Sequence, residues 1–307
     1  MRTDRCGAAS PAKLPGRLHE AAGDGGPRWM IIAPVSIGVQ NPAYRPASMN
    51  ILFMEPSSES TMQYAISAKD LYYTYRESSS GVEALKGLDL EIDRGEIFGF
   101  LGPNGAGKTT TIKLILGILR PQKGRVLLSG KDPSVPAARV SAGYMPEIAD
   151  YYRYLTPVEL LNMYGDVFRM DKKMLSARIP ELIAVVGLGK DANRIMRGFS
   201  KGMMQKVSFA QALINDPDVL ILDEPMSGLD PVSRARMRET LVELRTRGKT
   251  IFFSSHELSE VETVSDRIGI LNKGRMVIAG ALKDVISGKE ETESLEQYFL
   301  KIIGEAG

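Results

Sequence analysis

Residues 102–109, which read Gly-Pro-Asn-Gly-Ala-Gly-Lys-Thr, constrain the fold of this chain more than any other feature. They fit the pattern G-x-x-x-x-G-K-[ST], whose glycines let backbone N–H groups turn inward around phosphate oxygens. The apolar run Ile97–Leu101 before them predicts a buried strand, and residues 108–119 after them predict a helix. This order predicts a phosphate-binding loop that opens on the positive N-terminal end of a helix.

The loop also contains the side chains that a nucleoside triphosphate needs. Lys108 is expected to reach the β- and γ-phosphates, and the hydroxyl of Thr109 is expected to bind Mg²⁺. The alternative is a glycine-rich turn that binds nothing, but such a match arises by chance in only about one chain in a hundred of this length. The expected nucleotide ligands here are Gly102, Pro103, Asn104, Gly105, Ala106, Gly107, Lys108, Thr109 and Thr110.

Two carboxylates follow a second apolar run, at residues 219–222. Ligands in α/β sheets bind at the carboxyl ends of strands, so this is a favourable place for both groups. Asp223 is expected to hold Mg²⁺ through its water shell, and Glu224 to orient or deprotonate the attacking water. A surface turn is the alternative, because Pro225 ends the strand in any case.

Other apolar runs predict the architecture around these motifs. Alternating residues at 66–75 and 83–92 predict a small antiparallel sheet, and residues 150–215 are mostly helical in pattern. The apolar run at 250–253 precedes His256, which could hydrogen-bond the γ-phosphate, and a helix is expected at 231–247. Strands that alternate with helices predict a parallel sheet covered on both faces.

Taken together, these motifs resemble those of ATP-binding cassette ATPases. Residues 199–203 (Phe-Ser-Lys-Gly-Met) are similar to the family's signature motif, and residues 227–230 (Ser-Gly-Leu-Asp) to its D-loop. His256 corresponds to the switch histidine, and Tyr75 to the aromatic residue that stacks on adenine, although Tyr72 and Tyr73 are close rivals. The resemblance covers residues 64–287.

This resemblance implies a P-loop NTPase α/β fold with a mainly parallel sheet, an antiparallel β subdomain and a helical signature subdomain at about 148–212. It implies hydrolysis of ATP, with ATP and Mg²⁺ as cofactors. The catalytic residues would be Glu224 and His256, and the metal residues Thr109 and Asp223. Tyr75, Ser200 and Gly202 would join the ATP-binding residues. Ser200 also stands at a helix start, where free N–H groups bind anions; in this family that site closes over ATP bound by a second chain.

Two positions depart from the usual family pattern. The signature has Lys201 where many cassettes have glycine, and the Q-loop position carries Glu147 instead of glutamine. Both variants, and the ending at residues 294–300, resemble bacterial export-type cassettes that pair with separate membrane subunits. An extra carboxylate beside Asp223 and Glu224 would repel them, so Glu147 is expected to be a coupling residue and not a ligand. Glu260 and Glu262 are expected to lie on a solvated helix face.

The organisation of the chain completes these expectations. Residues 1–60 contain 6 Gly and 7 Pro without sustained periodicity, so residues 1–63 are expected to be a disordered or dispensable tail, and 288–307 a short helical extension. No apolar run reaches the roughly 20 residues of a membrane span. We therefore expect a separate integral membrane permease, two copies of this chain in the complex, and a cytoplasmic location on the inner face of the membrane.

Two alternatives remain open from the sequence. A soluble cassette protein that acts on nucleic acid or ribosomes is one, although the formal net charge of +2 gives no general support for nucleic-acid binding. A nucleotide-binding regulator without turnover is the other, and the presence of both Glu224 and His256 argues against it.

Overall fold

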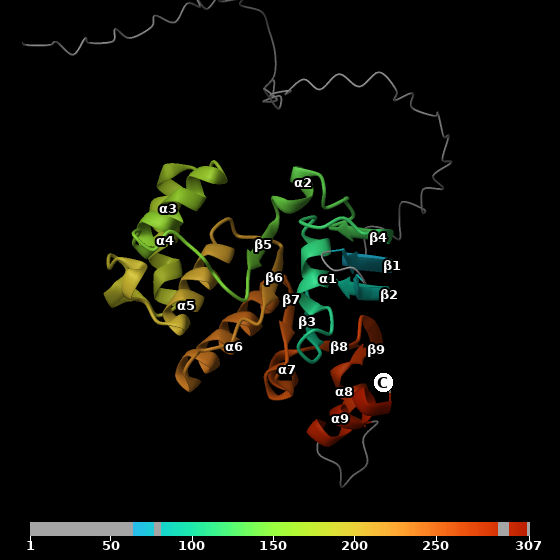
Figure 1. Cartoon of the computed structure of the whole chain (residues 1–307). Helices are drawn as coiled ribbons and strands as arrows, with labels where there is room; N and C mark the ends of the chain where they lie inside the picture. Colours follow the sequence, from blue (N-terminus) through green and yellow to red (C-terminus); the bar gives the residue numbers. More distant parts are fainter. Residues whose placement is uncertain (1–63, 77–80, 288–294, 306–307) are drawn as a thin grey trace, which may run out of the picture. The chain divides into compact units, whose positions relative to one another are not determined.

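The computed structural model describes residues 64–76, 81–287 and 295–305, and Figure 1 shows their arrangement. The expected tail at 1–63 and residues 288–294 of the expected C-terminal extension lie outside the described residues. Within the described part, two β-sheets and a group of helices build the fold, and each motif of interest lies at the end of a strand or the start of a helix.

The larger sheet has six strands in the order β5-β6-β7-β3-β8-β9. All neighbouring pairs are parallel except β8 and β9, which form an antiparallel pair at one edge. The strands are β3 (Ile97–Leu101), β5 (Ala142–Met145), β6 (Val219–Asp223), β7 (Thr250–Ser255), β8 (Arg267–Asn272) and β9 (Arg275–Ala281).

The smaller sheet is antiparallel, with β1 between β2 and β4. Its strands are β1 (Tyr64–Tyr75), β2 (Val82–Asp93) and β4 (Lys123–Leu128). The helix α1 (Lys108–Ile115) contacts all three strands and also β6, so it lies between the two sheets. The phosphate loop, which leads into α1, is therefore supported by both sheets.

Alternation along β3 explains why the larger sheet is covered on both faces. Successive side chains of a strand point to opposite sides. Ile97 and Leu101 join one apolar core with α5 (Lys201–Ala212), α6 (Pro231–Thr246) and α7 (Leu258–Val264). Phe98 and Phe100 join a second core with α1 and the smaller sheet. All four side chains are completely buried, so a strand that is apolar on both sides is the expected sequence.

The segment between β5 and β6 is mainly helical. It contains α3 (Pro157–Val167), α4 (Lys172–Val185), two short 3₁₀ turns (Gly189–Asp191 and Met196–Gly198) and α5. Side chains cap the helix starts: Thr156 and Glu159 form a reciprocal capping box at α3, and Asp171 accepts two backbone N–H groups at α4. In Figure 1, α3 and α4 lie beside α5, on the side of the sheet where β5 is the edge strand.

Three further helices complete the described part of the chain. They are the helices α2 (Pro136–Arg139), α8 (Leu282–Ser287) and α9 (Leu295–Glu305). None of the helices in the described ranges is both long and apolar enough to cross a lipid bilayer.

This architecture confirms the predicted fold class, but several element boundaries differ from the predictions. The helix expected at 108–119 ends at Ile115, because the chain turns through a left-handed backbone at Gly117, with φ +66°. The sequence predicts that the helix after Ser200 runs from Lys201 to Ile214, ahead of Pro217, but it ends two residues earlier, at Ala212.

Candidate functional site

Three neighbouring strands bring the phosphate loop, Glu224 and His256 together. In the sheet, β7 lies between β6 and β3, and all three run parallel. The loop at 102–107 follows β3, Glu224 follows β6, and His256 follows β7. Because parallel strands end at the same edge, three segments distant in sequence meet at one place.

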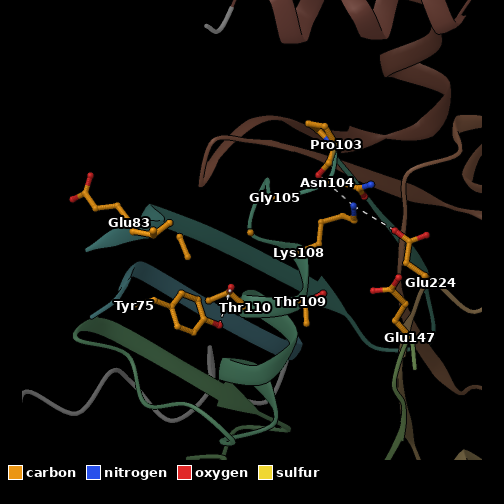
Figure 2. Close-up of a pocket in the computed structure, with 13 residues that line it drawn as sticks. Tyr75, Glu83, Pro103, Asn104, Gly105, Lys108, Thr109, Thr110, Glu147 and Glu224 are labelled. Atoms are coloured by element: carbon orange, nitrogen blue, oxygen red, sulfur yellow. Dashed lines mark hydrogen bonds and ion pairs between the residues drawn. The ribbon is translucent and has the colours of Figure 1, made fainter. Parts of the chain in front are cut away.

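A pocket of about 450 Å³ lies at this edge. Figure 2 shows Tyr75 on one side of it and Glu147 and Glu224 on the other, with the phosphate loop between them. Its lining comes from β1, β2, the loop, α1 and the segments after β5 and β6: Tyr75, Val82, Glu83, Ala84, Pro103, Asn104, Gly105, Gly107, Lys108, Thr109, Thr110, Glu147 and Glu224.

Close backbone contacts fix the conformation of the phosphate loop. Gly107 has φ +114°, and a Cβ atom there would lie 2.6 Å from the carbonyl oxygen of Ala84, so no other residue fits without distortion. The carbonyl of Ala106 accepts a hydrogen bond from the N–H of Gly274 (2.8 Å). The carbonyl of Gly274 in turn accepts one from the N–H of Lys86 on β2 (2.9 Å). The turn between β8 and β9 therefore ties the loop to the smaller sheet.

Lys108 closes this loop from inside. Its ammonium donates to the carbonyl of Gly102 at 2.6 Å and lies 3.4 Å from the carbonyl of Pro103. It also lies 3.3 Å from Oε1 of Glu224, in an ion pair whose two side chains are both more than 90% buried. The other carboxylate oxygen, Oε2, lies 2.8 Å from Nδ1 of His256. Glu224 therefore joins the loop to the strand end that carries His256.

A second cluster of polar oxygens surrounds Asp223. The hydroxyl of Thr109 donates to Oδ2 (3.0 Å), and the hydroxyl of Ser254 donates to Oδ1 (2.6 Å). A carboxylate and a hydroxyl held this close are hard oxygen donors of the kind that Mg²⁺ prefers. The donor set of Thr109 and Asp223 therefore fits Mg²⁺ beside the phosphate loop.

Burial raises the pKa values of two acidic groups in this region, Asp223 and Tyr144. It raises the pKa of Asp223, and the hydrogen bonds from Ser254 and Thr109 oppose that shift only in part. The negative charge of the adjacent Glu224 raises the pKa of Asp223 further, while the charge of Lys108 lowers it. Burial, with a smaller contribution from Asp223, also raises the pKa of Tyr144 on β5 to about 12.

Among Tyr72, Tyr73 and Tyr75, only Tyr75 lines the pocket. Its hydroxyl lies 3.3 Å from that of Thr110, and the ring of Tyr73 packs edge-on against it with centroids 4.9 Å apart. Tyr72 lies instead beneath the ammonium of Lys123, 4.7 Å from it. Of the three tyrosines considered from the sequence, Tyr75 is therefore the one that lines this pocket.

Ser200 and Gly202 lie at the start of α5 and are not part of the pocket lining. The hydroxyl of Ser200 caps the helix by accepting the N–H of Met203 (3.2 Å). A twelve-residue helix that starts here can bind an anion at this end. This end is separate from the phosphate loop of the same chain, so the structure does not gather all the predicted ATP ligands into one pocket.

Sequence reasoning missed two residues and misjudged a third. Ser254, on β7, bonds Asp223, and Gln205, on α5, donates to the carbonyl of Glu224 (3.0 Å). Ser254 could have been noticed as a polar residue within an apolar strand beside β6. The expectation that Glu260 is solvated is wrong: it is 4% exposed and accepts a hydrogen bond from Ser255 (2.7 Å). Burial raises its pKa.

Comparisons with known proteins agree with this geometry. The family model described as ABC transporter matches residues 85–227. An uncharacterized ABC transporter ATP-binding protein of Nostoc sp. is 47% identical over 73% of this chain and 68% of its own length. A fluoroquinolones export ATP-binding protein of Mycobacterium tuberculosis is 38% identical over 66% of this chain and 67% of its own length. A solved dimeric structure of a bacterial ABC transporter cassette is similar with a TM-score of 0.66 and 25% identity, over 71% of this chain and 98% of that one.

Proposed function

This chain belongs to the ABC transporter family, as an ATP-binding subunit that hydrolyses ATP, and from that premise we propose that it drives export through a separate permease. The relatives support transport and not the alternative role on nucleic acid or ribosomes. Export is proposed for two reasons. One relative is an export ATP-binding protein. The residues at the signature and Q-loop positions, Lys201 and Glu147, also resemble those of bacterial export-type cassettes.

The contact of Glu224 with both Lys108 and His256 is the observation that carries the proposed mechanism. The carboxylate would accept a proton from the attacking water as the water oxygen bonds to the γ-phosphorus and the bond to the β–γ bridging oxygen breaks. The products are ADP and phosphate. Lys108 would then neutralise phosphate charge, and His256 would orient the carboxylate and the γ-phosphate.

The same reasoning assigns the remaining ligands. Tyr75 would stack on the adenine, and the backbone N–H groups of residues 104–110 would surround the phosphates. Thr109 and Asp223 would hold Mg²⁺, directly and through water respectively, and the ion would neutralise the charge that develops on the phosphate oxygens. Glu147 lines the pocket at the end of β5 and would report nucleotide binding to the next segment of the chain.

A head-to-tail dimer of two copies is part of the proposal. The phosphate loop and the start of α5 at Ser200 and Gly202 would be two separate anion-binding sites of one chain, since neither Ser200 nor Gly202 lines the pocket at the loop. A dimer would let each loop face the α5 start of the other copy, so that two equivalent sites form together. The similarity to a dimeric cassette supports this arrangement.

The permease surface is proposed for the segment that follows Glu147. Ile148, Tyr152 and Tyr154 are 77%, 56% and 69% exposed, and the two tyrosine rings lie 5.6 Å apart. Exposed apolar side chains grouped within seven residues are typical of a protein interface. Because Glu147 lines the nucleotide pocket immediately before them, a permease bound here would sense the nucleotide. The protein would then lie at the inner face of the membrane.

Two measurements test this function. Release of phosphate from ATP by the purified chain should require Mg²⁺ and stop on addition of EDTA. Affinity purification from the native host should recover a protein with several membrane-spanning segments. Recovery of rRNA or DNA in its place would refute transport and support the nucleic-acid alternative.

A further inference from the structure

The backbone of Glu224 is held in an unfavourable conformation. Its φ is +50°, in the left-handed region where a side chain with Cβ is strained. Pro225 follows and restricts this residue further. The bend at this point places the carboxylate between Lys108 and His256. The catalytic geometry proposed above therefore depends on what keeps this backbone bent.

Side chains from two other elements bind the polar backbone groups of Glu224. Its N–H donates to the hydroxyl of Ser254 on β7 (3.0 Å). Its carbonyl accepts from Nε2 of Gln205 on α5 (3.0 Å), and also from the N–H of Ser227 (3.1 Å). Gln205 is only 2% exposed, so little water competes for this bond.

The helix that supplies Gln205 is the one that begins at the signature residues. Its start also packs on the loop that follows Glu224: the ammonium of Lys201 donates to the hydroxyl of Ser227 (2.9 Å). A Cβ atom on Gly202 would lie 2.8 Å from the carbonyl oxygen of Gly228. Together with the bond from Gln205 to Glu224, these contacts join α5 to the loop at 224–228 at three points. A displacement of the helix would therefore shift the backbone of Glu224.

We propose that Gln205 is a positioning residue that keeps Glu224 in its left-handed conformation and couples the two nucleotide sites of the dimer. This inference rests on the proposed function, since it takes Glu224 as the base and the α5 start as the segment that meets the other copy's ATP. When α5 engages that ATP, Gln205 transmits the position of the helix to the base of its own chain. Each site therefore becomes competent when the other is engaged.

The first test is a substitution at Gln205. Met is unbranched and of similar length but has no donor, so Gln205→Met removes one bond from the carbonyl of Glu224. The carbonyl keeps the N–H of Ser227, so the protein should fold. We expect kcat to fall about 10- to 100-fold, with KM and the ATP dissociation constant unchanged, because the phosphate loop is intact.

Gln211 offers a matched control on the same helix. It accepts a hydrogen bond from the hydroxyl of Tyr151 (3.0 Å). Gln211→Met should leave kcat unchanged and should alter the thermal midpoint about as much as Gln205→Met. Equal losses of kcat in the two variants would mean that Gln205 only supports the helix, and would overturn the proposal.

Mixed dimers of full-length chains with two affinity tags give the decisive test. One copy carries Glu224→Gln, so only the other copy's Glu224 can turn over ATP. With Gln205→Met in the copy that retains Glu224, turnover should fall about 10- to 100-fold below that of the dimer without Gln205→Met. With Gln205→Met in the Glu224→Gln copy, turnover should not change. Equal effects in both arrangements would refute the proposal, whereas a wild-type chain without ATPase activity would refute the proposed function instead.

Discussion

The ammonium of Lys108 lies 3.3 Å from Oε1 of Glu224, and both side chains are buried. The same ammonium is the group expected to bind the β- and γ-phosphates. The three N–H donors of this ammonium already face the carbonyls of Gly102 and Pro103 and the carboxylate of Glu224, so phosphates that bind it are expected to weaken these contacts. Binding of ATP and release of Glu224 are therefore expected to occur together, which frees the carboxylate for water only when substrate is present.

Replacing Glu224 with Gln tests this exchange. The amide keeps the size of the side chain but is neither a base nor a counter-ion for Lys108. Turnover should fall at least about 100-fold, while ATP should bind more tightly, because nothing charged competes for the ammonium. Phosphate release and titration with a fluorescent ATP analogue measure the two effects. Lys108→Ala is the control and should weaken binding about 10-fold or more, as expected for a lost bond to a charged group. Hydrolysis at the wild-type rate by Glu224→Gln would exclude Glu224 as the base.

Asp223→Asn should make the protein more stable while it removes activity. The raised pKa of Asp223 means that folding favours its protonated form, so its contribution to stability is present below the ordinary Asp pKa of about 3.9 and is lost as the pH rises through the raised pKa. At pH 7, without nucleotide or metal, the variant should therefore unfold a few degrees higher; about 1 kcal/mol corresponds to about 2–4 °C for a domain of this size. The difference should vanish near pH 3.

Asp230 provides a control of opposite sign. Hydrogen bonds from Ser233 lower its pKa, so its charged form stabilises the fold above the ordinary Asp pKa and this contribution is lost as the pH falls through the lowered pKa. Asp230→Asn should therefore lower the midpoint at pH 7. Thermal scans at pH 3 and pH 7 measure both variants. A lower midpoint at pH 7 for Asp223→Asn would contradict this account.

Crosslinking between copies tests whether the phosphate loop of one chain meets the start of α5 of the other. Cys6 is the only cysteine, so Cys6→Ser gives a clean background. Glu224→Gln is added to retain ATP, and Asn104→Cys and Met203→Cys then label the loop and the α5 start. Disulfides need Cα atoms within about 7 Å, so a short bifunctional thiol reagent supplements oxidation. Covalent dimers should form with ATP and Mg²⁺ and be rare without nucleotide.

Three controls accompany this crosslinking experiment. Adding Lys108→Ala should suppress the dimers, and each single-cysteine chain should give far fewer. Crosslinks that form equally well without ATP, or only within one chain, would show that the two anion sites do not meet across a dimer.

The exposed tyrosines predict where the permease binds. Changing both Tyr152 and Tyr154 to Ser should abolish co-purification of the membrane subunit and leave the thermal midpoint nearly unchanged, because both rings are exposed. Val232→Ser is a matched control, since Val232 is 75% exposed on the helix α6, whereas the two tyrosines lie in the loop before α3. Its co-purification should equal that of the wild type. If the tyrosine variant still recovers the permease in full, the contact lies elsewhere.

The sequence predicted the elements whose patterns are long or strongly apolar. The runs that form β3, β6 and β7 are apolar on both sides, so burial alone identifies them. It did not predict β4, which begins with exposed polar residues, or β5, which has only four residues and includes a glycine. Short strands of this kind are stabilised by their neighbours in the sheet, which a local pattern cannot report.

The site shows the same limit. Spacing and resemblance were sufficient to name Lys108, Asp223 and Glu224, because each belongs to a recognisable motif. Gln205 acts through a hydrogen bond to a residue nineteen positions away, and Glu260 is buried by contacts with another element. Neither contact can be read from periodicity within one helix, which reports only the side facing the main core.

The turn between β8 and β9 limits how short a functional piece of this protein can be. Gly274 bonds the carbonyl of Ala106 and is itself bonded by Lys86, yet it lies 47 residues beyond the end of the family match at residue 227. A gene fragment that ended after His256 would encode every recognisable motif and still lack this support for the loop. Truncated variants, split halves and domain fusions should therefore keep the chain through β9 if they are to bind nucleotide.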